Sequence, residues 1–329
     1  MEIGSDFQLP LFDTKRSDSL FFVSGRIAIT YILSSLMKPG DKCLIPNYLC
    51  ESVYDCFNNY DVDFYDIDND FNIIIDILKK KCNIHKYNVI FIINYFGKID
   101  DNIVNIQTLC RGNNITIIED FTHNIFSETL YGDISLCSYR KTIESPYGCV
   151  VRNNAFMLPT TQPIFFDSLY VCLCIVKLIA LSLKHFKCLK NIWRPLLMAC
   201  ENKLNDVQYD GFDYINYYFF RNFDRTIAEK CRRSNVNYLH KFCKYKCISK
   251  LYFTYPIVLN TKDERESLKN ALIRNKIYCT VLWPLYFDKQ ELCNSYISDR
   301  ILCIPIDQRY NLTHMKYITT ILNTHYDVN

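Results

Sequence analysis

The chain has 329 residues, of which 49% are hydrophobic and 22% charged, a balance that excludes disordered, collagen-like and coiled-coil proteins. Its net charge of +3 is spread along the sequence with both signs interspersed, so no basic patch indicates nucleic-acid binding. At roughly 100–200 residues per domain, the length predicts one large domain and a smaller one.

The first half of the chain alternates helical patterns with short apolar runs. Helices are predicted at Phe22–Met37, Glu51–Asn59, Phe71–Lys81 and Asp100–Cys110. Strands are predicted at Lys42–Pro46, Val62–Ile67, Asn88–Tyr95, Ile115–Ile118, Ile134–Tyr139 and Cys149–Arg152. Strands separated by helices of about 10–15 residues predict βαβ units, and therefore an α/β fold with a mostly parallel sheet flanked by helices.

The middle of the chain is strongly hydrophobic over Ile164–Leu183. This stretch carries Asp167 and Lys177, and its longest apolar run is far below the ~18 residues of a membrane span. We expect a helix packed in a core or a subunit interface, with a membrane-surface helix as the alternative, and no membrane span.

The second half predicts fewer strands and longer helices. Helices are predicted at 164–203, Asp213–Phe242, Asp263–Asn275 and Leu312–Asn323, and strands at Tyr252–Val258, Tyr278–Trp283 and Leu302–Pro305. We therefore divide the chain into a large domain over residues 1–205, which includes a helical connector at 164–203, and a small C-terminal α+β domain over 206–329.

Cysteine and glycine have unusual frequencies, with 17 Cys and only 8 Gly. The odd number of cysteines, the chain length and the absence of a signal peptide at residues 1–10 argue against a disulfide framework. No C-x2-C pair indicates zinc. We therefore expect free thiols that act as small hydrophobes, no metal, and a reducing, cytoplasmic compartment. So few glycines argue against Gly-rich phosphate loops, and neither a GxGxxG nor a Walker pattern occurs.

Ligands of parallel sheets bind beyond the carboxyl ends of the strands, so the polar residues at those ends are the candidates. Three groups of residues stand there or at a helix start: Asp120 with His123, Ser138 with Lys141, and Ser24-Gly25-Arg26. Tyr48 and Tyr95 are the aromatic candidates, and Asn94 lies beside Tyr95. Taken alone, each has a more common structural reading as a cap, a surface lysine or a packed histidine.

Together these residues fit the chemistry of pyridoxal 5'-phosphate (PLP). This cofactor needs an amine for a Schiff base, a carboxylate that keeps the pyridine nitrogen protonated, an aromatic neighbour and donors for its phosphate. Lys141 offers the amine and Asp120 the carboxylate. The helix that begins at Ser24-Gly25 offers backbone N–H groups to the phosphate. Lys141, once released by the incoming amine, would act as the base that moves the substrate proton.

Nine segments of the chain resemble the DegT/DnrJ/StrS family of sugar aminotransferases, which are fold-type-I PLP enzymes of the aspartate aminotransferase superfamily. They are FFVSGRIAITYIL (21–33), CLIPNYLCESV (43–53), VDFYDID (62–68), NYFGK (94–98), IIEDFTHN (117–124), YGDISLCSYRKTIESPYGCVV (131–151), FDRTIAEKCRRSNVNYL (223–239), VLWPL (281–285) and ILCIPIDQRYNLTHM (301–315). The resemblance implies a large domain with a seven-stranded type of sheet and a small C-terminal domain.

The resemblance also implies a role for each candidate residue. Lys141 corresponds to the Schiff-base lysine, Asp120 to the partner of the pyridinium, and His123 to the residue that contacts the ring oxygen. Ser24, Gly25, Arg26 and Ser138 correspond to phosphate ligands, Tyr48 or Tyr95 lies nearest the ring, and Asn94 and Tyr95 are substrate-binding candidates. The family also implies a homodimer with a shared active site.

The implied activity is transfer of an amino group from an amino acid, L-glutamate in our reading, to a keto-sugar nucleotide in surface polysaccharide or related amino-sugar biosynthesis. Two alternatives stay open. One is another PLP reaction, such as dehydration, epimerisation or decarboxylation. The other is a non-catalytic binding or regulatory descendant of the fold. The chain departs from the family pattern at Cys50, where an aromatic residue is usual, and after Lys141, where Gly148 alone remains of a glycine-rich segment.

Overall fold

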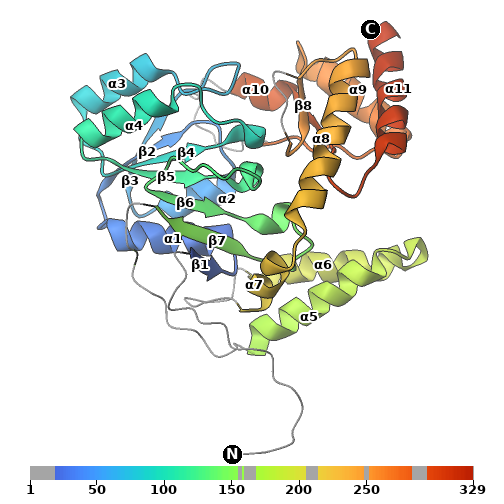
Figure 1. Ribbon diagram of the computed structural model, residues 1–329, viewed down its shortest axis with the longest axis horizontal. Helices are drawn as coiled ribbons and strands as arrows, with labels where there is room; N and C mark the ends of the chain where they lie inside the picture. The colour runs from blue at the N-terminus through green and yellow to red at the C-terminus, as the bar shows by residue number, and fades with distance from the viewer. Residues whose placement is uncertain are drawn as a thin grey trace, which may run out of the picture.

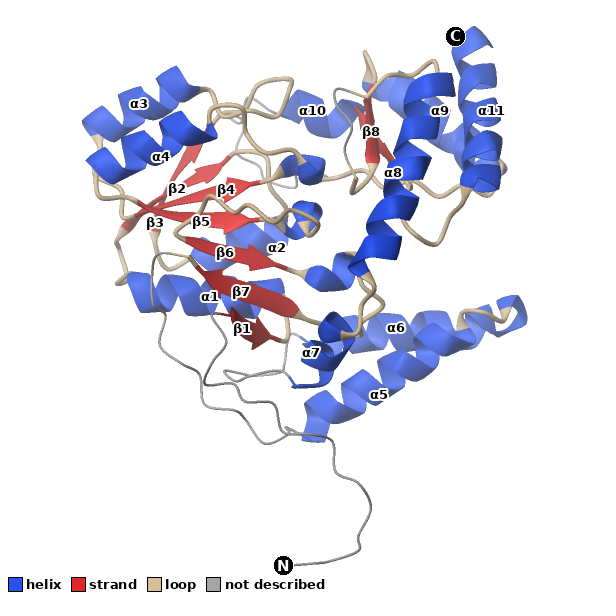
Figure 2. Cartoon of the chain, viewed as in Figure 1, coloured by secondary structure: helices blue, strands red, loops and turns tan. Residues whose placement is uncertain are grey.

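The computed structural model describes residues 19–154, 158, 168–204, 214–247, 252–283 and 295–328. Figures 1 and 2 show a layered α/β body, a projecting pair of helices and a smaller group of elements at the C-terminal end. The predicted boundary near residue 205 falls between described segments, and the division into two domains stays a proposal.

The large body is built on a seven-stranded sheet in the order β1-β7-β6-β5-β4-β2-β3. Its strands are β1 (Ser19–Phe22), β2 (Lys42–Pro46), β3 (Asp61–Tyr65), β4 (Val89–Ile93), β5 (Thr116–Asp120), β6 (Ile134–Cys137) and β7 (Cys149–Asn153). Strands β2 to β6 pair in parallel, whereas β7 runs antiparallel to both β1 and β6. The prediction of a mostly parallel α/β sheet is therefore confirmed.

Helices cover both faces of this sheet (Figure 1). They are α1 (Gly25–Leu36) and α2 (Glu51–Tyr54), followed by η2 (Asp55–Phe57), on one face, and α3 (Ile75–Ile84) and α4 (Ile103–Gly112) on the other. Ile29 and Leu33 of α1 pack against one set of strand side chains, and Leu78 and Ile106 against the other set. Because both faces of the sheet are covered, the residues of β4 are almost all apolar and buried, as expected for a central parallel strand.

Short 3-10 turns follow the central strands at the end where ligands of such sheets bind. They are η3 (Tyr95–Gly97) after β4, η4 (Thr122–Asn124) after β5 and η5 (Tyr139–Lys141) after β6. Gly97 has a positive φ of 102° there, and a Cβ at this position would lie 2.9 Å from the carbonyl oxygen of His123. Glycine thus allows the first two of these turns to pack closely.

The predicted connector forms two antiparallel helices. They are α5 (Ser168–Leu183) and α6 (Lys190–Leu204), joined through η6 (Lys187–Leu189). The pair projects from the sheet body (Figure 1). Tyr170 and Leu173 of α5 pack with Val23 and Tyr147 of the large body. The hydrophobic stretch is therefore packed on one side, while several of its apolar side chains on another side are exposed.

The remaining elements form the C-terminal group and its connection. They are α7 (Tyr214–Arg221), α8 (Arg225–Phe242), β8 (Tyr255–Val258), α9 (Lys262–Arg274), α10 (Ser295–Arg300), β9 (Ile301–Ile304) and α11 (Leu312–Val328). β8 and β9 form an antiparallel pair. The expected long helix Asp213–Phe242 is broken, because the Asp224 side chain accepts a hydrogen bond from the Ile227 N–H and begins a new helix there.

Three other sequence predictions differ from the structure. β1 and α10 were not predicted. The predicted strand Tyr278–Trp283 does not form, since only Thr280 makes an isolated bridge, to Cys303. The helix predicted from Phe71 begins instead at Ile75, because Phe71 has a positive φ of 62° that no α-helix accommodates. The described cysteines are all free, and most are buried, as expected for small hydrophobes.

Candidate active site

Asp120 stands at the carboxyl end of β5, and its carboxylate accepts a hydrogen bond of 2.9 Å from the Thr122 N–H. Burial raises the pKa of this carboxyl, while the charge of Lys141 and hydrogen bonds from Thr122 oppose part of the rise. The Thr122 hydroxyl accepts a hydrogen bond from the Ser138 N–H at 2.9 Å. The ends of the neighbouring strands β5 and β6 are thereby fixed to each other.

His123 is 5% exposed and has a defined hydrogen-bonding state. Its Nδ1 accepts a hydrogen bond from the Phe96 N–H at 3.2 Å. Burial, together with the nearby charge of Lys141, holds the pKa of this imidazole well below its ordinary value. A neutral ring whose Nδ1 is an acceptor carries its proton on Nε2. His123 therefore presents a hydrogen-bond donor rather than a positive charge.

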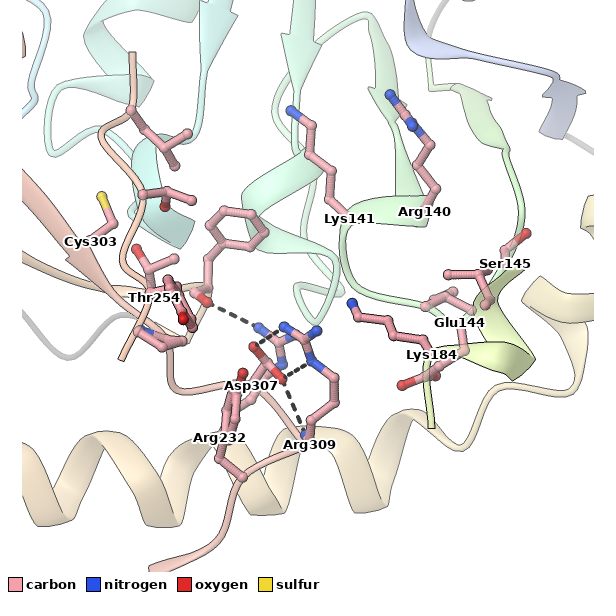
Figure 3. A pocket seen from close by; sticks show the side chains of 18 of the residues that line it. Arg140, Lys141, Glu144, Ser145, Lys184, Arg232, Thr254, Cys303, Asp307 and Arg309 are labelled. Atoms are coloured by element: carbon pink, nitrogen blue, oxygen red, sulfur yellow. Dashed lines mark hydrogen bonds and ion pairs between the residues drawn. The ribbon is translucent and has the colours of Figure 1, made fainter. Parts of the chain in front are cut away.

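Lys141 ends the turn η5, and its side chain is exposed. No hydrogen bond or ion pair to its amine is formed within the described part of the chain. The adjacent Arg140 is held differently, because its guanidinium lies 2.9 and 3.0 Å from the two carboxylate oxygens of Glu201. Figure 3 shows Lys141 and Arg140 projecting side by side from this turn. The lysine amine is therefore the available nucleophile of the pair.

The predicted phosphate residues come together at the start of α1. A Cβ added to Gly25 would lie 3.5 Å from Cβ and 3.8 Å from Oγ of Ser138, so the helix start and the end of β6 are in contact. Ser24 caps the helix, since its hydroxyl accepts a hydrogen bond from the Ile27 N–H at 3.3 Å. Arg26, the next residue in the helix, is half-buried.

Tyr48 and Tyr95 are buried beneath the site. The ring centroids of the two tyrosines are 5.5 Å apart, and that of Trp283 lies 5.5 Å from Tyr48 and 6.1 Å from Tyr95. Tyr95 donates a hydrogen bond to the carbonyl of Tyr48, and Tyr48 donates to the carbonyl of Leu282. The two tyrosines thus support the segment that carries Trp283, and their predicted contact with a cofactor ring stays a prediction.

Asn94 follows β4 but its side chain is directed at a buried carboxylate. Its amide donates to Glu119 at 2.7 Å, and Glu119 also accepts from the N–H groups of Tyr131 and Gly132. Asn94 is 3% exposed. The structure therefore gives Asn94 a supporting position between β4 and β5, and its predicted role in substrate binding stays untested.

Two spaces meet at Lys141. The first is a small cavity of about 10 Å³ among Asp120, Thr122, His123 and Trp283, with Cys50, Val53 and Ile93 completing its wall. It is about the size of one water molecule. The second is a cleft of about 990 Å³ between the turn η5, the end of α5 and the segments around β8 and β9. A lysine at the boundary of both spaces can reach either one.

Among the charged side chains that line the large cleft, the cationic ones outnumber the anionic ones (Figure 3). The cations are Arg140, Lys141, Lys184, Arg232 and Arg309, and the carboxylates are Glu144 and Asp307. Arg309 forms a bidentate pair with Asp307, with distances of 2.7 and 2.8 Å. Burial lowers the pKa of Arg232 to about 10. The excess of positive charge suits a ligand with anionic groups.

Two aromatic residues of the site were missed by sequence reasoning. The Phe253 ring stacks on His123 with centroids 3.8 Å apart and 14° between the planes. The Trp283 ring lies 5.5 Å away and 17° from parallel. Both residues lie in the C-terminal half of the sequence, more than 100 positions along the chain from His123. Two signals could have pointed to Trp283, namely the rarity of Trp, with two in the whole chain, and its place in the VLWPL segment (281–285).

Comparison with known proteins gives the same fold. No family model and no curated protein sequence matches the chain. Among solved structures, it is similar to PseC of Helicobacter pylori, an aminotransferase involved in the biosynthesis of pseudoaminic acid, with 13% identity, a TM-score of 0.67, and coverage of 94% of this chain and 87% of PseC. It is also similar to the aminotransferase TlmJ of Streptoalloteichus hindustanus, with 14% identity, a TM-score of 0.68, and coverage of 94% and 86%.

A third similar structure is NtdA of Bacillus subtilis, which was solved with bound cofactor PMP. The identity is 15%, the TM-score 0.65, and the coverage 93% of this chain and 73% of NtdA. At sequence identities this low, the structural similarity establishes a shared fold and nothing more. The fold predicted from the sequence, that of the sugar aminotransferases, is therefore confirmed, and the chemistry of this chain is inferred from its own site.

Proposed function

We propose that the protein is a PLP-dependent aminotransferase that acts on a sugar. The observation that carries the proposal is the convergence of Asp120, His123 and Lys141 on one small cavity, beside the contact of Gly25 with Ser138. Two of the similar solved structures, PseC and TlmJ, are aminotransferases, and a third, NtdA, was solved with PMP. This combination of fold and residue types supports PLP chemistry above any other reaction of the fold.

The donor set fits this cofactor. An exposed amine, a buried carboxylate, a neutral histidine with an Nε2 proton and a helix start beside a serine are the groups that PLP requires. The cavity among these groups, about 10 Å³ in volume, is too small for the cofactor, and the Trp283 ring, 5.5 Å from that of His123, forms part of its wall. Binding of the cofactor would therefore require the Trp283 side chain to withdraw, which opens the small cavity toward the cleft.

When bound, PLP supplies the electron sink through which an amino group moves between an amino acid and a carbonyl compound. The Asp120 carboxylate would hold a proton on the pyridine nitrogen, and its buried position strengthens that ion pair. His123 would donate its Nε2 proton to the ring oxygen. The Lys141 Nζ would carry the proton transferred at the substrate carbon. The N–H groups at the start of α1 and the Ser138 hydroxyl would hold the phosphate.

The cleft beside Lys141 would hold the substrates. Its volume of about 990 Å³ is large enough for a sugar that carries anionic substituents, and its cationic lining favours them. We propose a keto-sugar nucleotide as the acceptor and L-glutamate as the amino donor. A homodimer, in which a partner completes the open side of the site, belongs to the same proposal.

The test is the visible absorption of the protein after addition of PLP. The wild type is expected to acquire a band that persists through gel filtration, and Lys141→Ala is expected to lose it. Lys79→Ala, an exposed lysine on α3, is the matched control and should behave as the wild type. Addition of L-glutamate should then convert the band and release one 2-oxoglutarate per site. A wild type without a band would refute the proposal, and a band without 2-oxoglutarate would refute the donor.

The closed cavity favours one alternative, a non-catalytic binding descendant of the fold. In that case Trp283 and Phe253 would be permanent core residues, and PLP would leave the absorption of the wild type unchanged. The retention of Asp120 and Lys141 together argues against it, because a site without function has no reason to keep a buried carboxylate whose burial is unfavourable. The same titration with PLP distinguishes the two.

A further inference from the structure

The helical pair α5–α6 exposes apolar side chains in a way that the rest of the protein does not explain. On α5 the exposed residues are Leu169, Cys172, Ile175 and Ile179, and on α6 they are Ile192 and Met198. Ile175 and Ile179 are 52% and 51% exposed. We call the four residues of α5, which are spaced three, three and four positions apart and so lie on one side of the helix, the exposed hairpin face. Large contiguous apolar surfaces on soluble proteins mark interaction sites.

The exposed part of α5 lies apart from its packed and cleft-lining parts. Cys172, Ile175 and Ile179 follow each other at spacings of three and four, which places them on one side of a helix. Tyr170 and Leu173 pack against the large body instead. Leu178 and Leu181 line the cleft. The exposed hairpin face is therefore available to a partner without blocking the candidate active site.

Charge distinguishes this region from the rest of the chain. Residues 168–200 contain no Asp or Glu but five cations, Lys177, Lys184, Lys187, Lys190 and Arg194, whereas the rest of the chain holds 33 Lys and Arg against 35 Asp and Glu. Lys177 is buried against Glu201, and Lys184, Lys190 and Arg194 are exposed. Positive charge is therefore concentrated on the helical pair that also exposes the apolar residues.

Aromatic residues stand among these cations at the turn between the two helices. Phe186 is 58% exposed, and Trp193 is half-buried with the Lys184 ammonium 6.0 Å from the centre of its ring. Aliphatic and aromatic side chains flanked by lysine and arginine are the combination that binds the interface of an anionic bilayer. No helix in the described ranges is long and apolar enough to cross a membrane, so the hairpin would lie at the surface.

We propose that the exposed hairpin face binds the surface of an anionic lipid bilayer. A second copy of this chain is the competing occupant. In a two-fold symmetric contact the same face meets itself, which would bring both sets of exposed cations together, whereas anionic lipids neutralise them. The charge of the hairpin therefore favours lipid. This proposal stands independently of the PLP chemistry, because it uses no residue at Asp120 or Lys141.

The test is flotation of the full-length protein with two kinds of vesicle, phosphatidylcholine alone and an equimolar mixture of phosphatidylcholine and phosphatidylglycerol. The wild type is expected to float with the mixed vesicles, and added salt should weaken this binding. Ile175→Asp combined with Ile179→Asp should abolish it. Lys190→Gln combined with Arg194→Gln should weaken it about 25-fold, since each surface cation contributes about fivefold.

The matched control carries the same apolar-to-acidic change elsewhere. Ile84→Asp combined with Val104→Asp alters residues that are 73% and 65% exposed at α3 and α4, away from the hairpin, and should bind as the wild type does. Far-UV circular dichroism melts establish that each variant is folded. The fluorescence of Trp193, isolated in a Trp283→Phe background, should shift to shorter wavelength with the mixed vesicles.

Three results would overturn the proposal. The wild type could stay unbound with both vesicles. The Ile175→Asp, Ile179→Asp variant could float as well as the wild type. Finally, light scattering could show a wild-type dimer that the same variant converts to a monomer, without vesicle binding by either protein, which would identify a second copy as the occupant.

Discussion

A cluster of three charged side chains joins the hairpin to the turn that carries Lys141. Its members differ in burial, and this difference predicts how much each one contributes to stability. Lys177 of α5 contacts Glu201 of α6, and the ammonium lies 3.9 Å from the centre of the Tyr147 ring. Glu201 also pairs with Arg140. The Lys177 side chain is 7% exposed, whereas those of Arg140 and Glu201 are 30% and 39% exposed. The lysine is therefore the one member that water does not solvate.

Glu201→Gln is expected to destabilise the protein by about 2 kcal/mol. Loss of one partner of a fully buried ion pair costs roughly 3–5 kcal/mol, and the partial exposure of Glu201 reduces this figure. Lys177→Met should cost much less, because Glu201 keeps Arg140 and the methionine fills an apolar site. Burial lowers the pKa of Lys177 in spite of Glu201, so the charged lysine is held at a cost that methionine removes.

The assay is thermal and urea unfolding of both single variants and the double variant. A loss of 2 kcal/mol corresponds to a decrease in Tm of about 3 °C in a chain of 329 residues. The double variant should be more stable than Glu201→Gln alone. Burial alone would raise the pKa of Glu201, but Arg140 and Lys177 lower it. The contribution of Glu201 is therefore complete above the ordinary value of 4.5 and declines as the pH falls through the lowered pKa. Equal destabilisation by Lys177→Met and Glu201→Gln would refute this reasoning.

Three further predictions concern the site. Gly148→Ala should cost about 3 kcal/mol in urea unfolding, since φ is +122° and a Cβ would lie 2.2 Å from the Tyr139 ring. Gly112→Ala, in the helix α4 and with open space around it, is the control that should be neutral or stabilising by up to about 1 kcal/mol. Trp283→Ala should accelerate PLP association in stopped-flow absorbance, and an unchanged rate would show that the indole does not close the site. Asp120→Asn should stabilise the cofactor-free protein at pH 7, because burial raises the pKa of Asp120 and makes its charged form unfavourable in the folded protein. This gain in stability should disappear as the pH falls below the raised pKa toward 3.8. A gain that persists at low pH would contradict the prediction.

The sheet could be predicted from the sequence because its signals are local. Lys42–Pro46 was predicted as a strand with the bounds that β2 has in the structure. The runs of β4 and β5 are apolar without alternation, as both-face burial requires. The proximity of Asp120 and Lys141 could also be predicted, because they follow neighbouring parallel strands whose carboxyl ends meet at one edge of the sheet.

Elements whose conformation depends on distant packing could not be predicted in this way. The residues Tyr278–Trp283 have the composition of a strand, but they bridge β9 only at Thr280, and Trp283 turns toward Tyr48 and His123 instead. The sequence between α5 and α6 holds no Gly or Pro that would indicate a turn. Both outcomes are decided by contacts between segments that lie far apart in the chain, which periodicity does not report.

Contacts between distant segments also decide which residue supplies the aromatic side chain in the wall of the small cavity. The position two residues after Tyr48 holds Cys50, where the sequence resemblance led us to expect an aromatic ring. Cys50 and Trp283 line the same small cavity. A thiol is much smaller than an aromatic ring, so it leaves room that the Trp283 indole occupies. If the indole stands in the place of the missing aromatic ring, Cys50→Phe should leave it less room to withdraw and so weaken PLP binding, whereas Cys50→Phe with Trp283→Ala should restore it. Equal PLP affinities of the single and double variants, measured by absorbance titration, would show that the two positions are independent.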